Sequence, residues 1–216
     1  MSPNAVDTGS TTKSPNFTAS HSVLLDHPIS IVFEILGTTK GHERVCKLSS
    51  LCSSFELLEH DEVALADNAK LAESSVRTLP AHTTLPTGAS ISADGASHAQ
   101  ADVKPATEAA NPRLLPRQAF KMQEVVPVLF GVIKTTVDLS GTLTWDEYAR
   151  VALYETISNQ GIVTWKVRVF EEEEGGKKTR VNERIEGWCP GWMKMIVQSE
   201  ASKSHKAHME QYHTLF

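Results

Sequence analysis

The C-terminal half of the chain constrains the fold most, because strand-like segments follow one another there and end in one long helical segment. From Arg117 to Val126 the side chains alternate with a period of two, which is typical of a strand with one buried face. A β-branched segment follows and breaks at Ser140 and Gly141. Further strands are predicted at 148–157, 162–170 and 179–188, and the stretch 192–212, which lacks proline and glycine, predicts a helix.

The N-terminal block predicts one strand, two short helices and a further strand. Val23, Leu24 and Leu25 form the apolar centre of a strand at 18–26, and the Asp-His-Pro turn that follows is typical of a helix start. The expected elements after this turn are a helix from Ile29 to Leu36, a second helix at about 41–50 and a strand at 55–58.

A low-complexity tract at about 61–112 separates the two blocks. It is rich in Ala, Ser, Thr, Asp and Pro and contains no aromatic residue, so it offers too little apolar surface to offset the entropy of ordering. We interpret it as a disordered insertion. An interdomain linker is the alternative, but the block before it is too short for a stable core of its own. The chain is therefore predicted to form one domain at 18–216, after a disordered tail at 1–17.

Composition excludes some classes of partner. The chain has 21 basic and 26 acidic residues and a net charge of −5, which argues against nucleic acid or an anionic membrane as the main partner. No apolar run is long enough to cross a bilayer, and residues 1–20 lack the apolar run of a signal peptide. Three cysteines, Cys46, Cys52 and Cys189, fit reduced thiols better than a disulfide framework. We expect a cytoplasmic protein.

Two segments carry a resemblance to a known superfamily. "SVLLDHPISIVFEIL" at 22–36 and "GWCPGWMKMIV" at 187–197 resemble the START-like or SRPBCC helix-grip proteins. The resemblance covers about 18–60 and 113–212, and the chain departs from it through the insertion and an acidic hairpin at 171–174. It looks most like small fungal members associated with natural-product biosynthesis.

The resemblance implies an α+β fold, in which a curved antiparallel sheet of about six to seven strands wraps around a long C-terminal helix. A cavity for a hydrophobic small molecule lies between sheet and helix in such proteins. The superfamily includes polyketide cyclases, pericyclic-reaction catalysts, lipid-transfer domains and hormone receptors, so the fold alone does not decide the function.

The walls of such a cavity are predicted from apolar and aromatic residues. The inward stripe of the last helix is expected to contain Met193, Val197, Ala201, Ser204, His208 and Tyr212, whose small central members leave volume open. Aromatic rings stack on flat or polyene ligands, although ordinary core packing explains about half of these residues. The predicted ligand-binding residues are Trp145, Tyr148, Trp165, Trp188, Trp192, Met193, Val197 and Tyr212.

Three polar residues are the candidate catalytic groups: Tyr154, His208 and Arg168. The solvated outer face of the sheet is the favoured position for most of the strand lysines and arginines, including Lys166. His205 and His208 share a helix face, but no carboxylate or cysteine at matching spacing completes a metal site, so we predict no metal. The chain has no nucleophile, Walker or dinucleotide motif, and we predict no cofactor.

The leading hypothesis is a cofactor-free cyclase or pericyclase, of Diels–Alder or related type, acting on a hydrophobic polyketide or terpenoid intermediate. A shaped cavity that folds a flexible chain into its reactive conformer needs little covalent machinery. The alternative is a non-catalytic protein that binds or transfers a lipid, sterol or metabolite. A third possibility is an interaction protein whose insertion binds partners. In each case we expect a monomer or weak dimer.

Overall fold

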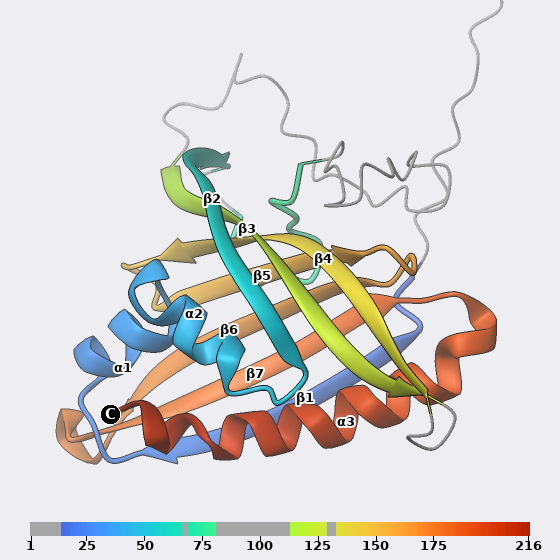
Figure 1. The fold of residues 1–216 in the computed structure, drawn as a ribbon. Coiled ribbons are helices and arrows are strands. Elements are labelled where there is room, and N and C mark those ends of the chain that lie inside the picture. The colour runs from blue at the N-terminus through green and yellow to red at the C-terminus, as the bar shows by residue number, and fades with distance from the viewer. Residues whose placement is uncertain (1–13, 67–68, 81–112, 129–132) are drawn as a thin grey trace, which may run out of the picture.

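The computed structural model describes residues 14–66, 69–80, 113–128 and 133–216. Within these residues one antiparallel sheet of seven strands has the order β1-β7-β6-β5-β4-β3-β2, and three α-helices accompany it (Figure 1). This architecture confirms the predicted α+β helix-grip fold. The strands are β1 Phe17–Leu25, β2 Cys52–Leu65, β3 Arg113–Val128, β4 Ile133–Asp146, β5 Val151–Ser158, β6 Val163–Glu173 and β7 Lys178–Trp188. The helices are α1 Ile29–Leu36, α2 Thr39–Lys47 and α3 Lys194–Glu210.

The first two strands lie at opposite edges of the sheet. β1 pairs with β7, with Val23 opposite Val181, whereas β2 pairs only with β3. The connection between them contains α1 and α2, which lie at one end of the concave face, while α3 runs along β1 (Figure 1). Two register shifts in β2, between Cys52 and Ser54 and between Leu57 and His60, accompany the curvature of this edge.

Helix α1 anchors the core as its spacing predicts. Val32, Phe33 and Leu36 are buried on one face, and the Phe33 ring meets Phe170 of β6 edge-on at a centroid distance of 5.0 Å. The amide of Gly37 donates to the carbonyl of Phe33 and ends the helix there. This packing fixes the end of α1 against the middle of the sheet.

Strand β4 passes through Gly141 without interruption, so the predicted break at Ser140 and Gly141 is wrong. A Cβ at Gly141 would lie 2.3 Å from the carbonyl oxygen of Glu155 and 2.7 Å from Cζ of Phe120. Glycine is required here because neighbouring atoms approach the backbone closely, which is one of the functions of glycine inside a strand.

Part of the predicted disordered insertion packs on the outer, convex face of the sheet. Residues 61–65 belong to β2, and the segment 69–80 places Leu71 and Val76 against Leu153 and Val167. The predicted start of the insertion, at about residue 61, is therefore too early. The apolar side chains after this point are short and widely spaced, but they still cover a stripe of the sheet. Residues 81–112 lie outside the described residues, as do residues 1–13 of the predicted tail.

Helix α3 presents a slightly different face from the one predicted. His205 and Met209 are its buried residues, whereas Ser204 is exposed, so the inward stripe is rotated by about one residue. Short 3-10 turns at Gly191–Met193 and Tyr212–Leu215 precede and follow the helix. None of the helices described in the structure has the length and apolar character that crossing a membrane requires.

Candidate functional site

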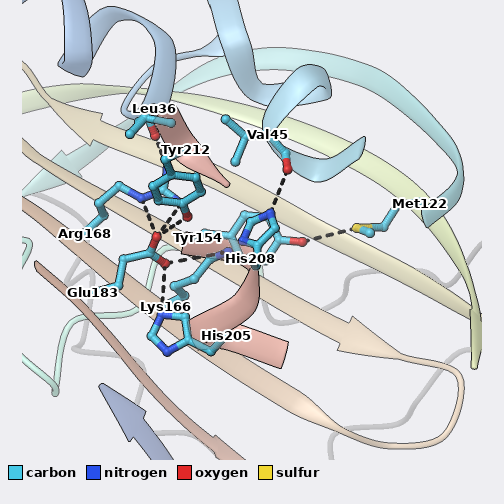
Figure 2. A network of polar contacts seen from close by, with 10 residues as sticks. All are labelled: Leu36, Val45, Met122, Tyr154, Lys166, Arg168, Glu183, His205, His208 and Tyr212. Carbon is cyan, nitrogen blue, oxygen red and sulfur yellow. Dashed lines mark hydrogen bonds and ion pairs between the residues drawn. The ribbon is translucent and has the colours of Figure 1, made fainter. Parts of the chain in front are cut away.

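A buried polar network occupies the concave face between the central strands and α3 (Figure 2). Alternate residues of β5, β6 and β7 point to this side, so Tyr154 lies opposite Lys166 and Arg168 lies opposite Glu183. The C-terminal segment adds His205, His208 and Tyr212 from the facing side. Charged groups therefore stand where the sequence predicted an apolar lining.

Arg168 and Glu183 form the centre of this network. The Nε–H of Arg168 donates to Oε1 of Glu183 at 2.9 Å, and Nη2 donates to the hydroxyl of Tyr212 at 2.7 Å. The Tyr212 hydroxyl in turn donates to Oε1 of Glu183, and Nη1 of Arg168 donates to the carbonyl oxygen of Leu36. These bonds join β6 and β7 to the end of α1 and to the segment after α3.

The second oxygen of Glu183 is less well satisfied. Oε2 lies 3.9 Å from Nζ of Lys166 and 3.6 Å from Nε2 of His205, and it accepts no hydrogen bond from the residues that the structure describes. Burial alone would raise the pKa of Glu183, but Arg168 and Lys166 outweigh it and hold the pKa well below its ordinary value. Glu183 is therefore an anion shared by several donors.

His208 has a defined tautomer. Its Nε2 lies 2.8 Å from the carbonyl oxygen of Val45, and because a carbonyl only accepts, Nε2 must carry the hydrogen. Burial, with Lys166 nearby, lowers the pKa of His208 to about 4. At neutral pH the ring is uncharged and Nδ1 holds a lone pair, as a general base requires.

Among the described residues, the hydroxyl of Tyr154 has only a weak hydrogen-bond partner. It donates to the sulfur of Met122 at 3.2 Å, and Phe120 stacks beside its ring at a centroid distance of 5.1 Å. Burial raises the pKa of Tyr154 well above its ordinary value, so the hydroxyl remains a proton donor. A thioether is a weak acceptor, so a ligand oxygen can compete for this hydrogen bond.

His42 of α2 is a buried member of the site that the sequence analysis missed. It meets the rings of Phe55, Phe120 and Tyr154 at centroid distances of 5.0, 4.7 and 5.8 Å. Neither ring nitrogen has a hydrogen-bond partner among the described residues. Burial, followed by the charge of Lys166, lowers its pKa to about 3. A histidine among exposed helix residues gives no signal in the sequence for such an aromatic enclosure.

The predicted ligand-binding residues separate into three groups. Trp145 and Tyr212 are buried on the concave side, and Met193 and Val197 are partly buried near the start of α3. Tyr148 and Trp192 are 95% and 77% exposed, so neither forms part of a wall. Trp165 and Trp188 take outer-face positions of β6 and β7, and the Arg77 guanidinium lies 3.9 Å over the Trp165 ring. Trp165 and Trp188 face outwards because their strand positions alternate with the positions that face the concave side.

The three predicted catalytic residues all reach the concave side, but in different states. Among the described residues, His208 bonds to the Val45 carbonyl and Tyr154 to the weak acceptor Met122, whereas Arg168 is 7% exposed and bonded through three nitrogens. The expected outer-face position of Lys166 is wrong, because Lys166 shares the concave side with Arg168. Their alternate spacing on β6, matched by Glu183 on the next strand, was the available signal.

A hollow lies on the opposite, convex face of the sheet. It has a volume of about 450 Å³ and is open to solvent, between β1, β6 and β7 and the segment 69–80. Its lining residues are Ser20, His21, Ser22, Ala72, Val167, Val169, Asn182, Glu183 and Arg184. In the described ranges, no three histidine, cysteine or acidic side chains converge in a way that could hold a metal ion.

Comparisons with known proteins relate the chain to others by shape. No family model and no curated protein matches its sequence. Among solved structures, it is similar to the Zhui aromatase/cyclase from Streptomyces sp. R1128, with a TM-score of 0.53, 8% identity and 91% of each chain covered. It also matches protein CV1439 from Chromobacterium violaceum, with a TM-score of 0.46, 10% identity and 92% and 96% coverage. At this identity the likeness shows the fold alone, and this fold is the helix-grip fold.

Proposed function

We propose that this protein is a cofactor-independent cyclase acting on a hydrophobic polyketide or terpenoid intermediate, by a Diels–Alder-type cycloaddition or a related cyclisation. The observation that carries the proposal is the neutral His208, whose Nε2–H is committed to Val45 and whose Nδ1 has no hydrogen-bond partner among the described residues. Its fold, similar to that of an aromatase/cyclase, supports the same class of reaction.

The proposed roles follow from the proton states. The hydroxyl of Tyr154 donates to a ligand carbonyl, which lowers the energy of negative charge developing on that oxygen. In a proton-transfer cyclisation, Nδ1 of His208 removes a proton from the carbon next to this carbonyl, and the resulting enolate carbon attacks the carbon of a second carbonyl in the same ligand. The π bond of that second carbonyl breaks, and its oxygen takes up the proton that His208 holds. In a cycloaddition no proton moves, and the Tyr154 hydrogen bond activates the alkene conjugated to the carbonyl.

Arg168 has a different role from the one that the sequence predicted. Its donors are already bound to Glu183, Tyr212 and Leu36. It is therefore a positioning residue, which holds this hydrogen-bonded network in place next to Lys166. A substrate carbonyl would have to displace one of these buried bonds to reach it, which costs free energy.

The alternative is a carrier that binds the same ligand without chemistry. Arg168 and Tyr212 satisfy each other's hydrogen-bonding groups, and this favours the carrier. A rigid polar network is enough to orient a bound molecule without chemistry. The two proposals differ in whether a product forms in the absence of any added cofactor.

The test begins with native mass spectrometry and organic extraction of protein purified from its own host. The recovered ligand, or a polyene ketone of the same class, is then incubated with wild type, His208→Gln and Tyr154→Phe. Loss of about 10²–10⁴-fold in rate with unchanged ligand affinity in His208→Gln supports proton-transfer cyclisation. A rate lowered only in Tyr154→Phe supports cycloaddition. The exposed His213→Gln is the matched control.

Binding without product formation by wild type would overturn the cyclase and leave the carrier. Product formation at equal rates in all variants would remove the proposed roles of His208 and Tyr154. Glutamine at position 208 retains an N–H for Val45, so a loss of rate in that variant reports on Nδ1 and not on the fold.

A further inference from the structure

The ammonium of Lys166 has unused hydrogen-bonding capacity. Its contacts with described residues are Oε2 of Glu183 at 3.9 Å and the Tyr154 ring at 4.4 Å, and neither is a hydrogen bond. An ammonium has three donors and no acceptor. The Lys166 side chain is 16% exposed, so the group is partly buried but within reach of a ligand.

The charges around Lys166 do not balance. Glu183 is the one carboxylate that pairs with both Lys166 and Arg168 among the described residues, and Arg168 occupies its Oε1 at 2.9 Å. Glu124 on β3 makes no ion pair with Lys166 in the described part of the chain. Burial raises the pKa of Glu124 and lowers the pKa of Lys166, and Glu183 opposes the shift of Lys166. A buried positive charge in excess costs free energy unless an anion compensates it.

The surroundings of this charge are aromatic. Lys166 lies against the Tyr154 face, and the Phe120 and Phe55 rings continue the wall at centroid distances of 5.1 Å from Tyr154 and 5.6 Å from each other. A flat apolar wall beside one charged donor is typical of a site that binds a hydrophobic molecule through one polar end.

We propose that Lys166 binds an anionic oxygen of the ligand, a carboxylate or the enolate of a 1,3-dicarbonyl, and that the site therefore selects acidic hydrophobic molecules. The ligand's anion completes the charge balance with Glu183 and Arg168. That this molecule is also a substrate rests on the proposed function. The inference that it carries a negative charge does not rest on the proposed function.

A purely structural role makes the opposite prediction for stability. If Lys166 serves mainly to neutralise Glu183, Lys166→Met leaves a buried carboxylate short of a partner and lowers the melting temperature. If Lys166 is the excess cation, its removal relieves a cost in the ligand-free protein and raises the melting temperature. The exposed Lys206→Met on α3 is the control for the change in net charge.

The binding test uses two probes of the same shape, 2-naphthoate and 2-naphthamide, titrated calorimetrically into ligand-free wild type and both variants. We expect wild type and Lys206→Met to bind the carboxylate at least about tenfold more tightly than the amide, since a charge-assisted hydrogen bond replaces a neutral one. In Lys166→Met the two affinities should become equal. Equal affinities in wild type, or a preference that survives in Lys166→Met, would overturn the proposal.

If neither probe binds wild type, the melting temperatures decide: a rise in Lys166→Met supports the excess-charge argument, and a fall overturns it. The outcome is separate from the cyclase test. If the protein prefers naphthoate but forms no product, the acidic-ligand site is supported and the cyclase is overturned. If Lys166→Met turns over a neutral polyene at the wild-type rate, the cyclase is supported and the acidic-ligand site is overturned.

Discussion

Arg168 and Glu183 face each other directly across β6 and β7, with Nε and Oε1 2.9 Å apart, and Arg168 also donates to the carbonyl of Leu36 at the end of α1. The pair therefore connects the sheet to the helix that covers one end of the site. Both side chains are buried, so their interaction is little screened by solvent.

Removing one partner of this pair should destabilise the protein strongly. We expect Arg168→Met to lower the free energy of unfolding by about 3–5 kcal/mol, because Oε1 of Glu183, the Tyr212 hydroxyl and the Leu36 carbonyl all lose their buried donor. The double variant Arg168→Met/Glu183→Leu should recover part of this loss in urea titrations. The half-exposed pair of Arg180 with Glu173 on the same strands is the control, and Arg180→Met should cost less than about 1 kcal/mol. A double variant less stable than Arg168→Met would contradict this account.

Stability should fall in mild acid because of two buried histidines. The folded-state pKa values of His42 and His208 are lowered to about 3 and about 4, so both rings stay neutral in the folded protein while the unfolded chain takes up protons below about 6.5. Their contribution is complete above pH 6.5 and is lost as the pH falls towards 4, at about 1.4 kcal/mol per group and pH unit.

The measurement is urea unfolding at pH 7.5 and 5.0. His42→Leu should lose clearly less stability than wild type between these two values, since one of the two protonating groups is gone. The exposed His213→Gln should keep the wild-type pH dependence. An unchanged slope in His42→Leu would show that its ring is accessible to protons in the folded state.

Gly141→Ala should be destabilising although it changes one methyl group. The added Cβ would lie 2.3 Å from the Glu155 carbonyl oxygen, so β4 and β5 must separate locally, at a cost of about 1–3 kcal/mol. Thermal unfolding measures the effect. Gly191→Ala, where a Cβ meets nothing within 4 Å, should change the free energy of unfolding by less than about 0.5 kcal/mol. Equal effects at the two positions would contradict the close approach at Gly141.

The packing of the segment 69–80 against the sheet should depend on the carboxylate of Glu155. Oε2 of the fully buried Glu155 accepts the Thr78 amide at 2.6 Å and the Leu79 amide at 2.8 Å. Burial raises the pKa of Glu155, so the neutral Glu155→Gln should retain the segment, whereas Glu155→Leu leaves both amides without an acceptor. We expect trypsin to cleave after Arg77 at least about tenfold faster in Glu155→Leu. Cleavage at the wild-type rate would show that apolar packing alone holds the segment.

Much of the fold follows from local sequence patterns. The helical spacing from Ile29 to Leu36 and the alternation around Phe120 each predict an element that the structure contains. The break predicted at Gly141 was wrong because glycine signals both a turn and a close approach, and only the neighbouring strand distinguishes the two.

The site was only partly predictable for a related reason. The parity of a strand places Lys166 and Arg168 on one side but does not say which side is buried. The importance of Glu183 follows from its register with Arg168, which depends on the length of the β6–β7 hairpin. His42 could not be predicted, because its aromatic neighbours come from β2, β3 and β5.

The pairing of β1 with β7 also determines the order in which the protein can fold. β1 can pair with β7, as Val23 does with Val181, only after the ribosome has added β7, long after β1 has left the exit tunnel. Strands β3 to β7, by contrast, pair with their neighbours in sequence. During synthesis β1, α1 and α2 therefore exist without their sheet. The polar frame of Arg168, Glu183 and Tyr212 assembles only when the last segment docks, so the site forms late in folding.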